Sequence, residues 1–292
     1  MTLLAQFEKG KLLSTLSTLG IGGPAKYFIE VASVEKMQEV LRFCYLEKIP
    51  YIVIGKGSNS LFDDRGFGGL VILNKITFCT FGECIVHVGA GYSFSLLGAQ
   101  TARKGWSGLE FASGIPATVG GAVYMNAGAN GKETVESLKS IDYITEEGDL
   151  VCLPKEDLEF SYRFSSFQKM KGAIVGATFE LSPSLEAREQ QIKIIEYRSK
   201  TQPLKDKSAG CIFRNPSPYS AGHLIEKSGL KGHSVGGAQV SDKHANFIIN
   251  KGHATAQDVF ALAIKIKKTV KEKTGIDLEM EIRLIPYVNI SS

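Results

Sequence analysis

The chain carries two glycine-rich stretches, Gly55-Lys56-Gly57-Ser58-Asn59-Ser60 and Gly114-Ile115-Pro116-Ala117-Thr118-Val119-Gly120-Gly121-Ala122, and the second continues into Asn126-Ala127-Gly128. The first follows an apolar segment, residues 51–54, that is typical of a buried strand, and backbone amides at such a strand end can turn toward phosphate oxygens. The small residues of the second stretch let a flat ligand or another backbone approach closely. Two such loops favour a dinucleotide cofactor over two coincidental turns, although glycine content alone does not identify the cofactor.

The first stretch matches neither of two common nucleotide-binding motifs. A P-loop needs the spacing GxxxxGK[ST], which the sequence lacks. A Rossmann fingerprint needs glycine at its sixth position, where this chain has Ser60, and an amphipathic helix directly afterwards, which the sequence does not predict. A phosphate-binding loop and a plain turn therefore both stay open for residues 55–60.

Composition narrows the class of protein. The 292 residues have 43% hydrophobic and 22% charged side chains and a mean hydropathy of +0.00, which excludes disordered and low-complexity chains. At roughly 150 residues per domain, this length predicts about two domains. No apolar run reaches the roughly 18 residues that span a bilayer, and residues 1–13 lack the apolar stretch of a signal peptide. We therefore expect a soluble, cytoplasmic protein that makes no membrane contact.

Charge and cysteine usage narrow the class further. Residues 188–283 carry 17 basic and 10 acidic side chains, so this part is the better candidate for receiving an anion, although a solvated lysine-rich helix explains much of the excess equally well. No basic stripe or recognisable module points to a nucleic-acid partner. The five cysteines and five histidines are scattered, so we expect reduced thiols and no metal site.

Periodicity predicts a mixture of helices and strands. Ser33 is expected to cap a helix whose apolar positions repeat every 3.6 residues, and Thr255 with Asp258 predicts a capping box for a long helix that ends near Gly275. Further helices are expected near residues 95–104, 185–200 and 221–228, with a glycine-containing loop at 208–216. Strands are expected at 27–31, 51–54, 70–73, 76–80, 85–88, 140–145, 150–153, 173–181, 246–250 and 278–285.

Several motifs, in order along the chain, resemble those of UDP-N-acetylenolpyruvoylglucosamine reductases. They are the two glycine-rich stretches, Ser161-Tyr162-Arg163-Phe164-Ser165, Ser208-Ala209-Gly210-Cys211-Ile212-Phe213-Arg214-Asn215-Pro216, residues 241–250, and Leu278-Glu279-Met280-Glu281-Ile282-Arg283. The resemblance implies an α+β fold with a two-part FAD-binding domain of the vanillyl-alcohol-oxidase (PCMH) type, residues 1–182 with a core at about 16–181, and a smaller α+β substrate-binding domain, residues 183–292. The short spacing after Pro216 resembles the shorter, type II-like form of the enzyme.

The resemblance also implies a reaction in peptidoglycan precursor synthesis. NADPH would reduce non-covalently bound FAD, and hydride would then pass to the enolpyruvyl group of UDP-N-acetyl-3-O-(1-carboxyvinyl)glucosamine to give UDP-N-acetylmuramate. The residues that it assigns to FAD are Gly55, Lys56, Gly57, Ser58, Asn59, Ser60, Gly114, Ile115, Pro116, Gly120, Gly121, Asn126, Gly128 and Arg283. We expect the protein to be a monomer. Two alternatives are another non-covalent FAD oxidoreductase of the same fold and a non-catalytic flavin or nucleotide-sugar binding module.

Two charged residues are candidates for catalysis. From the sequence alone, Arg163 is either a surface arginine or a guanidinium that binds a carboxylate in bidentate fashion, and the resemblance implies that it contacts the enolpyruvyl carboxylate. Apolar and charged residues alternate over 278–284, so Glu279, Glu281 and Arg283 are expected to share one face, which is either solvated or functional. The resemblance maps Glu281 onto the catalytic glutamate, which would stabilise an enolate-like intermediate beside Arg163.

Cys211 departs from the commonest pattern of the family, which has serine there. A free cysteine is usually a small, inert, buried residue. The functional interpretation makes Cys211 the acid that protonates carbon 2 of the substrate after hydride arrives at carbon 3, because a thiol with a reference pKa near 8.5 is a far better acid than an unactivated hydroxyl. A thiol would also make the site open to oxidation and alkylation.

The remaining candidates belong to the nucleotide-sugar end of the substrate. They are Tyr162, Asn215, Lys231, Lys243, His244 and Asn246. Loop capping and solvation explain most of them about as well as ligand binding does. His244 precedes an apolar strand and is at least as well explained as a structural histidine, whereas Asn215 is the strongest because it lies within a matched motif.

Overall fold

The structure is a computed structural model that describes residues 3–288, and it divides into two compact units. Unit 1 contains Phe28–Lys56, Leu70–Tyr197 and the described residues up to Glu8. Unit 2 contains Lys9–Tyr27, Gly57–Gly69 and the described chain from Arg198 onward. The units are thus discontinuous along the chain, and the domain division at residues 182 and 183 stays a prediction.

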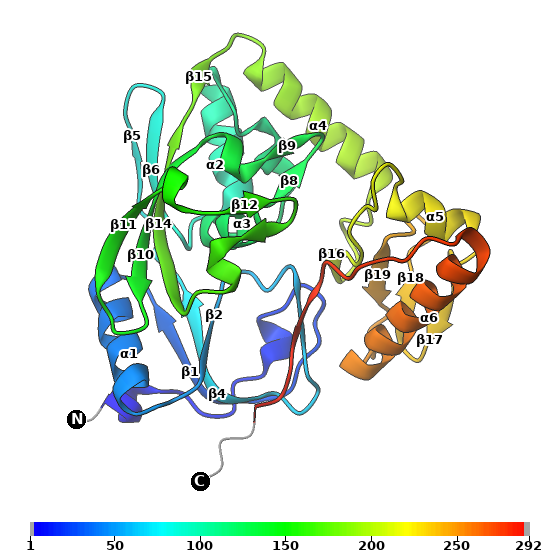
Figure 1. Cartoon of the computed structure of the whole chain (residues 1–292), viewed down its shortest axis with the longest axis horizontal. Helices are drawn as coiled ribbons and strands as arrows, with labels where there is room; N and C mark the ends of the chain where they lie inside the picture. The colour runs from blue at the N-terminus through cyan, green and yellow to red at the C-terminus, as the bar shows by residue number, and fades with distance from the viewer. Residues whose placement is uncertain (1–2, 289–292) are drawn as a thin grey trace. The chain divides into compact units, whose positions relative to one another are not determined.

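An antiparallel sheet of order β11-β10-β14-β6-β5 forms the centre of unit 1 (Figure 1). Its strands are β5 (Cys79–Phe81), β6 (Ile85–Gly89), β10 (Leu138–Thr145), β11 (Leu150–Pro154) and β14 (Gly172–Glu180). Residues 173–177 of β14 are all buried, as expected of a strand covered on both faces. A second sheet has the order β1-β4-β2, formed by β1 (Ala25–Val31), β4 (Phe67–Asn74) and β2 (Tyr51–Ile54), and β2 runs parallel to β4.

The helices α1 (Val34–Leu46), α2 (Phe94–Arg103) and α3 (Val119–Met125) lie entirely within unit 1. The predicted cap of α1 is confirmed, because the Ser33 side chain accepts the N–H of Lys36. The core contains an aromatic group, with the Phe94 and Phe111 rings 5.9 Å apart edge to face and Phe179 beside Phe94. Full burial of each ring contributes about 1.5–3 kcal/mol, so this group anchors α2 on the sheet.

Short elements complete unit 1. The strands β7 (Trp106–Ser107) and β15 (Ser182–Pro183) pair, as do β8 (Gly128–Ala129) with β9 (Lys132–Glu133) and β12 (Phe160–Ser161) with β13 (Phe164–Ser165). The 3-10 helices are η1 (Leu3–Gln6), η3 (Glu110–Gly114), η4 (Thr134–Glu136), η5 (Lys155–Asp157) and η6 (Ser166–Gln168). The boundary between the units falls within helix α4 (Ala187–Thr201), between residues 197 and 198.

Unit 2 is built on an antiparallel sheet of order β16-β19-β18-β17, with helices α5 and α6 beside it (Figure 1). The elements are η2 (Leu13–Thr15), β3 (Ser60–Phe62), β16 (Ser208–Cys211), α5 (Ala221–Lys227), β17 (Ser234–Val235), β18 (Ala238–Val240), β19 (Phe247–Asn250), α6 (Ala256–Thr274) and β20 (Arg283–Ile285). The predicted capping box at Thr255 and Asp258 is confirmed, and Gly275 ends α6 at φ 75°. The buried residues of α6, Val259, Leu262, Ala263, Ile266 and Val270, form one stripe that packs into the core.

The prediction of a last strand over residues 278–285 is wrong in its extent, because β20 covers only Arg283–Ile285. The segment changes its hydrogen-bond partner halfway. The Glu281 N–H donates to the Ile212 oxygen at 2.8 Å, whereas the Arg283 N–H donates to the Asn59 oxygen at 3.0 Å. A continuous ladder with one neighbour therefore cannot form.

Three further sequence predictions need correction. The expected alternation ends before Leu284, which is 44% exposed. Residues 208–211 form β16 rather than part of a loop, and residues 119–125 form α3, which glycine content had concealed. In α3 the N-cap side chain of Thr118 and packed neighbours outweigh the low helix propensity of two glycines.

Candidate active site

The two glycine-rich stretches meet within unit 1. A Cβ added at Gly55 would lie 2.3 Å from Thr118 Oγ1, so only glycine permits this approach. Thr118 Oγ1 also accepts the Gly121 N–H at 3.3 Å, and the Gly120 N–H donates to the Ala90 oxygen at 2.8 Å. Close packing against Thr118 and Ala90 thus explains these glycines before any ligand is considered.

The first stretch is divided between the two units. Gly55 and Lys56 belong to unit 1, and the residues from Gly57 onward belong to unit 2. Gly57 has φ 58°, and a Cβ there would lie 2.3 Å from the Leu16 oxygen. The Lys56 Nζ donates to Ser93 Oγ at 3.1 Å, and burial lowers the pKa of this lysine. The hydrogen bond holds the Lys56 side chain at Ser93, the N-cap residue of α2.

A buried hydroxyl group in unit 1 lacks a hydrogen-bond partner within residues 3–288, and this bears on whether the loops fit a flavin nucleotide. Ser113 immediately precedes Gly114, and its Oγ is buried with no hydrogen-bond partner among residues 3–288. An unpaired buried hydroxyl costs about 1–3 kcal/mol, which a ligand atom bonded to it would offset. The following Ile115 is partly exposed and Pro116 is exposed. Small-residue loops beside an unsatisfied hydroxyl fit an FAD site.

The structure brings four predicted residues of unit 1 together around Arg163. The guanidinium donates to the Gly128 oxygen at 3.0 Å and lies 4.6 Å from the centroid of the Tyr162 ring. Arg163 Nη1 also lies 3.7 Å from the Glu133 carboxylate, with 15% and 27% of the two side chains exposed. Asn126 is the last of the four predicted residues, after Arg163, Gly128 and Tyr162. Its side-chain amide donates a hydrogen bond to Glu133 Oε2 at 2.9 Å. A largely buried guanidinium held in this way can present a planar donor face to an anion.

The backbone at two of these residues is unusual. Arg163 has φ 59° between β12 and β13, and Asn126 has φ 42° at the end of α3. The Arg163 oxygen accepts from Gln168 Nε2 at 3.0 Å, and Asn126 Oδ1 accepts the Val135 N–H at 3.1 Å. A left-handed backbone conformation is uncommon for arginine and costs free energy, so it persists only where surrounding contacts hold it. Such strained residues are often found at functional sites.

Cys211 lies at the end of β16 in unit 2, opposite Phe247 of β19. The residues after it are fixed by Asn246, which is 2% exposed. The Ile212 N–H donates to the Asn246 backbone oxygen at 2.8 Å, and the Asn246 side chain accepts the Phe213 N–H at 3.0 Å and donates to the Phe213 oxygen at 2.8 Å. Asn246 is thus a structural residue that holds the backbone beside the thiol.

Glu281 and Arg283 lie in the same unit and meet residues of the first glycine-rich stretch. The Glu281 N–H donates to the Ile212 oxygen at 2.8 Å, so the glutamate backbone is hydrogen-bonded to the residue after Cys211. The backbone oxygen of Glu281 accepts a hydrogen bond from Asn59 Nδ2 at 3.2 Å. The parallel pair β20 and β3 places Arg283 opposite Ser60. Ser58 is the residue before Asn59 and is partly exposed.

His244 and Lys243 have structural partners. His244 Nδ1 accepts the Asn246 N–H at 3.2 Å, and the ring lies 4.8 Å from that of Phe247. Burial, more than any neighbouring charge, lowers the pKa of His244 and favours the neutral ring. Lys243 Nζ donates to the Ser199 oxygen at 2.6 Å and so fastens this loop to the end of α4.

Asn215 and Lys231 also have local partners in unit 2. Asn215 Oδ1 accepts the Ala221 N–H at 2.9 Å and so supports the start of α5. Lys231 Nζ pairs with Glu226 at 2.7 Å, and this pair lowers the pKa of the glutamate. Binding of the nucleotide sugar by these residues stays a prediction.

Three residues near the predicted ones escaped the sequence analysis. Glu133 holds Arg163 and Asn126, Ser113 carries the unsatisfied hydroxyl, and Arg198 lies electrostatically close to Cys211. Ser113 adjoins a quoted stretch and could have been included on that ground. Glu133 ends the short strand β9 and Arg198 lies on a charged helix, and no sequence pattern distinguishes either residue.

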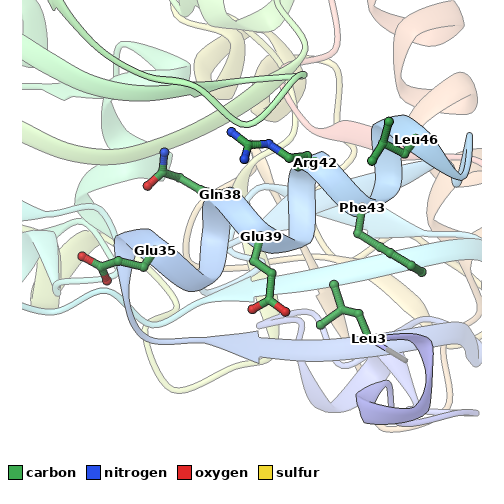
Figure 2. Close-up of a pocket in the computed structure, with 7 residues that line it drawn as sticks. All are labelled: Leu3, Glu35, Gln38, Glu39, Arg42, Phe43 and Leu46. Carbon is green, nitrogen blue, oxygen red and sulfur yellow. The ribbon is translucent and has the colours of Figure 1, made fainter. Parts of the chain in front are cut away.

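A surface pocket of about 480 Å³ lies between η1 and α1 in unit 1 and contains none of the predicted site residues (Figure 2). It is lined by Leu3, Glu35, Gln38, Glu39, Arg42, Phe43 and Leu46. Over residues 3–288 no three His, Cys, Asp or Glu side chains are grouped to hold a metal ion. No helix in that range is both long and apolar enough to cross a membrane.

Comparison with known proteins covers the chain almost from end to end. A family described as FAD binding domain matches residues 25–153, and one described as UDP-N-acetylenolpyruvoylglucosamine reductase, C-terminal domain, matches residues 202–285. The chain is 61% identical to the UDP-N-acetylenolpyruvoylglucosamine reductase of Protochlamydia amoebophila over 97% of its own length and 95% of the relative's. It is 52% identical to that of Chlamydia muridarum, with 94% and 93% covered. The crystal structure of the Thermus caldophilus reductase matches with a TM-score of 0.82 at 37% identity, covering 96% of this chain and 99% of that one.

Proposed function

The chain belongs to the UDP-N-acetylenolpyruvoylglucosamine reductase family, FAD-containing oxidoreductases of peptidoglycan precursor synthesis, and from this premise we propose which residues carry out the reduction. NADPH is the reductant, Cys211 is the proton donor, and Arg163 and Glu281 act on the substrate carboxylate. The end-to-end match with reductases of the same name supports the reaction most strongly, because it extends over 97% of the chain at 61% identity for one relative and 94% at 52% for another. FAD supplies the hydride chemistry when bound.

The roles of the residues follow from their chemistry. Arg163 offers a planar, permanently charged donor face to the carboxylate. Glu281, in its protonated form, donates a hydrogen bond to the substrate carboxylate and so stabilises the enolate-like charge that develops when hydride has been added to carbon 3. The Cys211 S–H bond then breaks and a C–H bond forms at carbon 2, which leaves a thiolate that regains its proton from water. The backbone hydrogen bond between Glu281 and Ile212 supports this pairing of roles, because it ties the glutamate to the residue beside the thiol.

The test of the reaction is NADPH oxidation by the purified flavoprotein with and without the enolpyruvyl nucleotide. We expect oxidation only when the nucleotide is present, with UDP-N-acetylmuramate as product. Oxidation that does not depend on the nucleotide would favour another FAD oxidoreductase of this fold, and no oxidation at all would favour a binding module. Denaturation should release the flavin from the chain, since we propose that FAD is bound non-covalently.

The test of Cys211 separates the two half-reactions. The variant C211A should accept electrons from NADPH at the wild-type rate, as followed by flavin absorbance, but should lose at least about 100-fold in overall turnover, the usual value of a positioned general acid. The variant C211S should retain turnover and resist alkylation. Normal turnover by C211A would refute the role of Cys211 as proton donor.

We also propose a cytoplasmic monomer. A cytoplasmic location fits cysteines that form no disulfide within residues 3–288, namely Cys44, Cys79, Cys84, Cys152 and Cys211. Sedimentation equilibrium of the flavoprotein should return the mass of one chain, 31.7 kDa plus FAD. A mass of two chains would overturn the monomer.

A further inference from the structure

Glu133 is a partly buried carboxylate of unit 1 that the proposed mechanism does not use. Its Oε1 lies 3.7 Å from Arg163 Nη1, and its Oε2 accepts a hydrogen bond from Asn126 Nδ2 at 2.9 Å. Only 27% of the Glu133 side chain and 15% of the Arg163 side chain are exposed. Water and salt screen such a pair less than they screen a surface ion pair, so it can fix the geometry of its members.

The guanidinium of Arg163 is held by both strands of one hairpin. The pairing of β8 with β9 places Gly128 opposite Glu133. Arg163 Nη2 donates to the Gly128 oxygen at 3.0 Å, while Nη1 faces the Glu133 carboxylate. The two terminal nitrogens thus meet acceptors on neighbouring strands, and these contacts fix the plane of the guanidinium. Bidentate binding of a carboxylate depends on the direction of that plane.

The end of α3 holds the backbone around this ion pair. Gln168 Nε2 donates to the backbone oxygens of Tyr124 and Arg163, at 3.1 and 3.0 Å. Because Tyr124 lies in the last turn of α3, the left-handed residue 163 is tied to that turn. Asn126, the residue after the helix, donates to Glu133. The backbone of Arg163 and the carboxylate that faces its side chain are therefore both fastened to the end of one helix.

The hydrogen bonds of Asn126 and Arg163 require an acceptor at both ends of the side chain at position 133. Asn126 Oδ1 accepts the Val135 N–H at 3.1 Å, so the amino group of the amide is the end that faces Glu133. Arg163 is a donor only. A carboxylate offers an acceptor at each end, whereas the amide of glutamine offers one acceptor and one donor. Position 133 therefore needs a carboxylate to hold both neighbours.

The charge of Glu133 works against the binding of an anion by Arg163. A carboxylate beside an arginine that receives an anion repels that anion and so lowers its affinity. Orientation has the opposite effect, because a guanidinium that is already held in one plane loses less conformational freedom when a ligand binds. The two effects predict opposite results when the charge is removed but the shape is kept, so an experiment can separate them.

We propose that Glu133 is a positioning residue for Arg163, whose guanidinium it holds in the orientation that receives the carboxylate of the enolpyruvyl group. This inference rests on the proposed role of Arg163 in binding that carboxylate. It gives Glu133 a part in specificity, because a correctly oriented guanidinium favours the nucleotide sugar that carries the carboxyvinyl group over the same nucleotide sugar without it. In this protein the benefit of orientation exceeds the cost of the additional negative charge.

The experiment compares two ligands of the oxidised, FAD-loaded protein by isothermal titration calorimetry without NADPH. They are the enolpyruvyl nucleotide and UDP-N-acetylglucosamine, which lacks the carboxyvinyl group. The dissociation constant of UDP-N-acetylglucosamine divided by that of the enolpyruvyl nucleotide gives the carboxylate preference. In E133Q we expect the carboxylate preference to fall about tenfold, because one of the two contacts of position 133 is lost. E133D keeps both acceptors on a shorter side chain and should lose less, about threefold.

The matched control is E136Q. Glu136 lies three residues further along, is exposed, and pairs with Lys132 at 2.9 Å. The variant removes a carboxylate charge from the same turn, and its carboxylate preference should stay within about twofold of the wild type. R163M should lose the carboxylate preference at least as strongly as E133Q. The double variant E133Q/R163M should match R163M, because Glu133 acts through Arg163.

The outcomes distinguish this inference from the proposed function. A carboxylate preference in E133Q that equals or exceeds that of the wild type, together with an impaired R163M, would overturn the role of Glu133 and leave that of Arg163 intact. A double variant that falls well below R163M would also overturn it. An unchanged preference in R163M would refute the proposed role of Arg163, and this inference with it. If E133Q does not retain FAD, E133D takes its place, and an unchanged preference in E133D would overturn the inference.

Discussion

The contact between Gly55 and Thr118 predicts a graded series of three glycine-to-alanine variants. A Cβ at Gly55 would lie 2.3 Å from Thr118 Oγ1 and 2.9 Å from its Cγ2. At Gly120 a Cβ would lie 2.9 Å from the Ala90 Cβ, and at Gly121 the nearest atom would be Thr118 Oγ1 at an ordinary 3.4 Å. The methyl group added by each glycine-to-alanine change is therefore most crowded at position 55, less crowded at 120 and uncrowded at 121.

The expected size of each effect follows from these distances. G55A must displace Thr118, which costs about 1–3 kcal/mol in overpacking and about 1 kcal/mol for the lost cap of α3. For this size of unit, each kcal/mol lowers the Tm by roughly 2–4 °C, so we expect a fall of about 4–16 °C. G120A should cost less, and G121A should be neutral or stabilising by up to about 1 kcal/mol, because alanine favours a helix.

The assay is thermal unfolding of the flavin-free protein, so that cofactor binding does not enter the comparison. Flavin retention is measured separately on each variant, and we expect G55A to lose FAD most readily. A G55A protein as stable as G121A would contradict the reasoning, since it would mean that Thr118 yields without cost.

Two further predictions concern unit 2. N246A should lower the free energy of unfolding by about 2–4 kcal/mol in a urea titration, because it leaves the buried N–H and C=O of Phe213 without their side-chain partner. As a control, replacement of the exposed Lys251 by Ala should change the free energy of unfolding by less than about 0.5 kcal/mol. Equal effects of the two variants would contradict the role of Asn246. The hydrogen bond from Arg65 lowers the pKa of Asp63 to about 2, well below the usual range of an aspartate. A lowered carboxyl pKa gives stability that is present above about pH 4 and lost as the pH falls toward 2. We therefore expect R65M to be less stable than the wild type at neutral pH and to lose less of its stability on acidification. Parallel acid-unfolding curves for the two proteins would refute this.

The sequence alone determined the parts of the fold that depend on neighbours along the chain. The helix α6 was predicted together with both of its ends, because Thr255, Asp258 and Gly275 act on the backbone within one turn. The helix α1 was predicted from Ser33 and a 3.6-residue repeat for the same reason. The order of the motifs along the chain predicted the family, and the comparisons with known proteins confirmed it.

Only the tertiary structure decided which groups act on one another. Glu133 meets Arg163 although the two are 30 positions apart in the sequence, and no pattern in either segment indicates that contact. The last strand is shorter than its alternation predicts, because residues 279–283 exchange one hydrogen-bond partner for another. Local sequence fixes caps, periods and turns through short-range hydrogen bonds, whereas burial and electrostatic coupling depend on which distant segments the fold brings together.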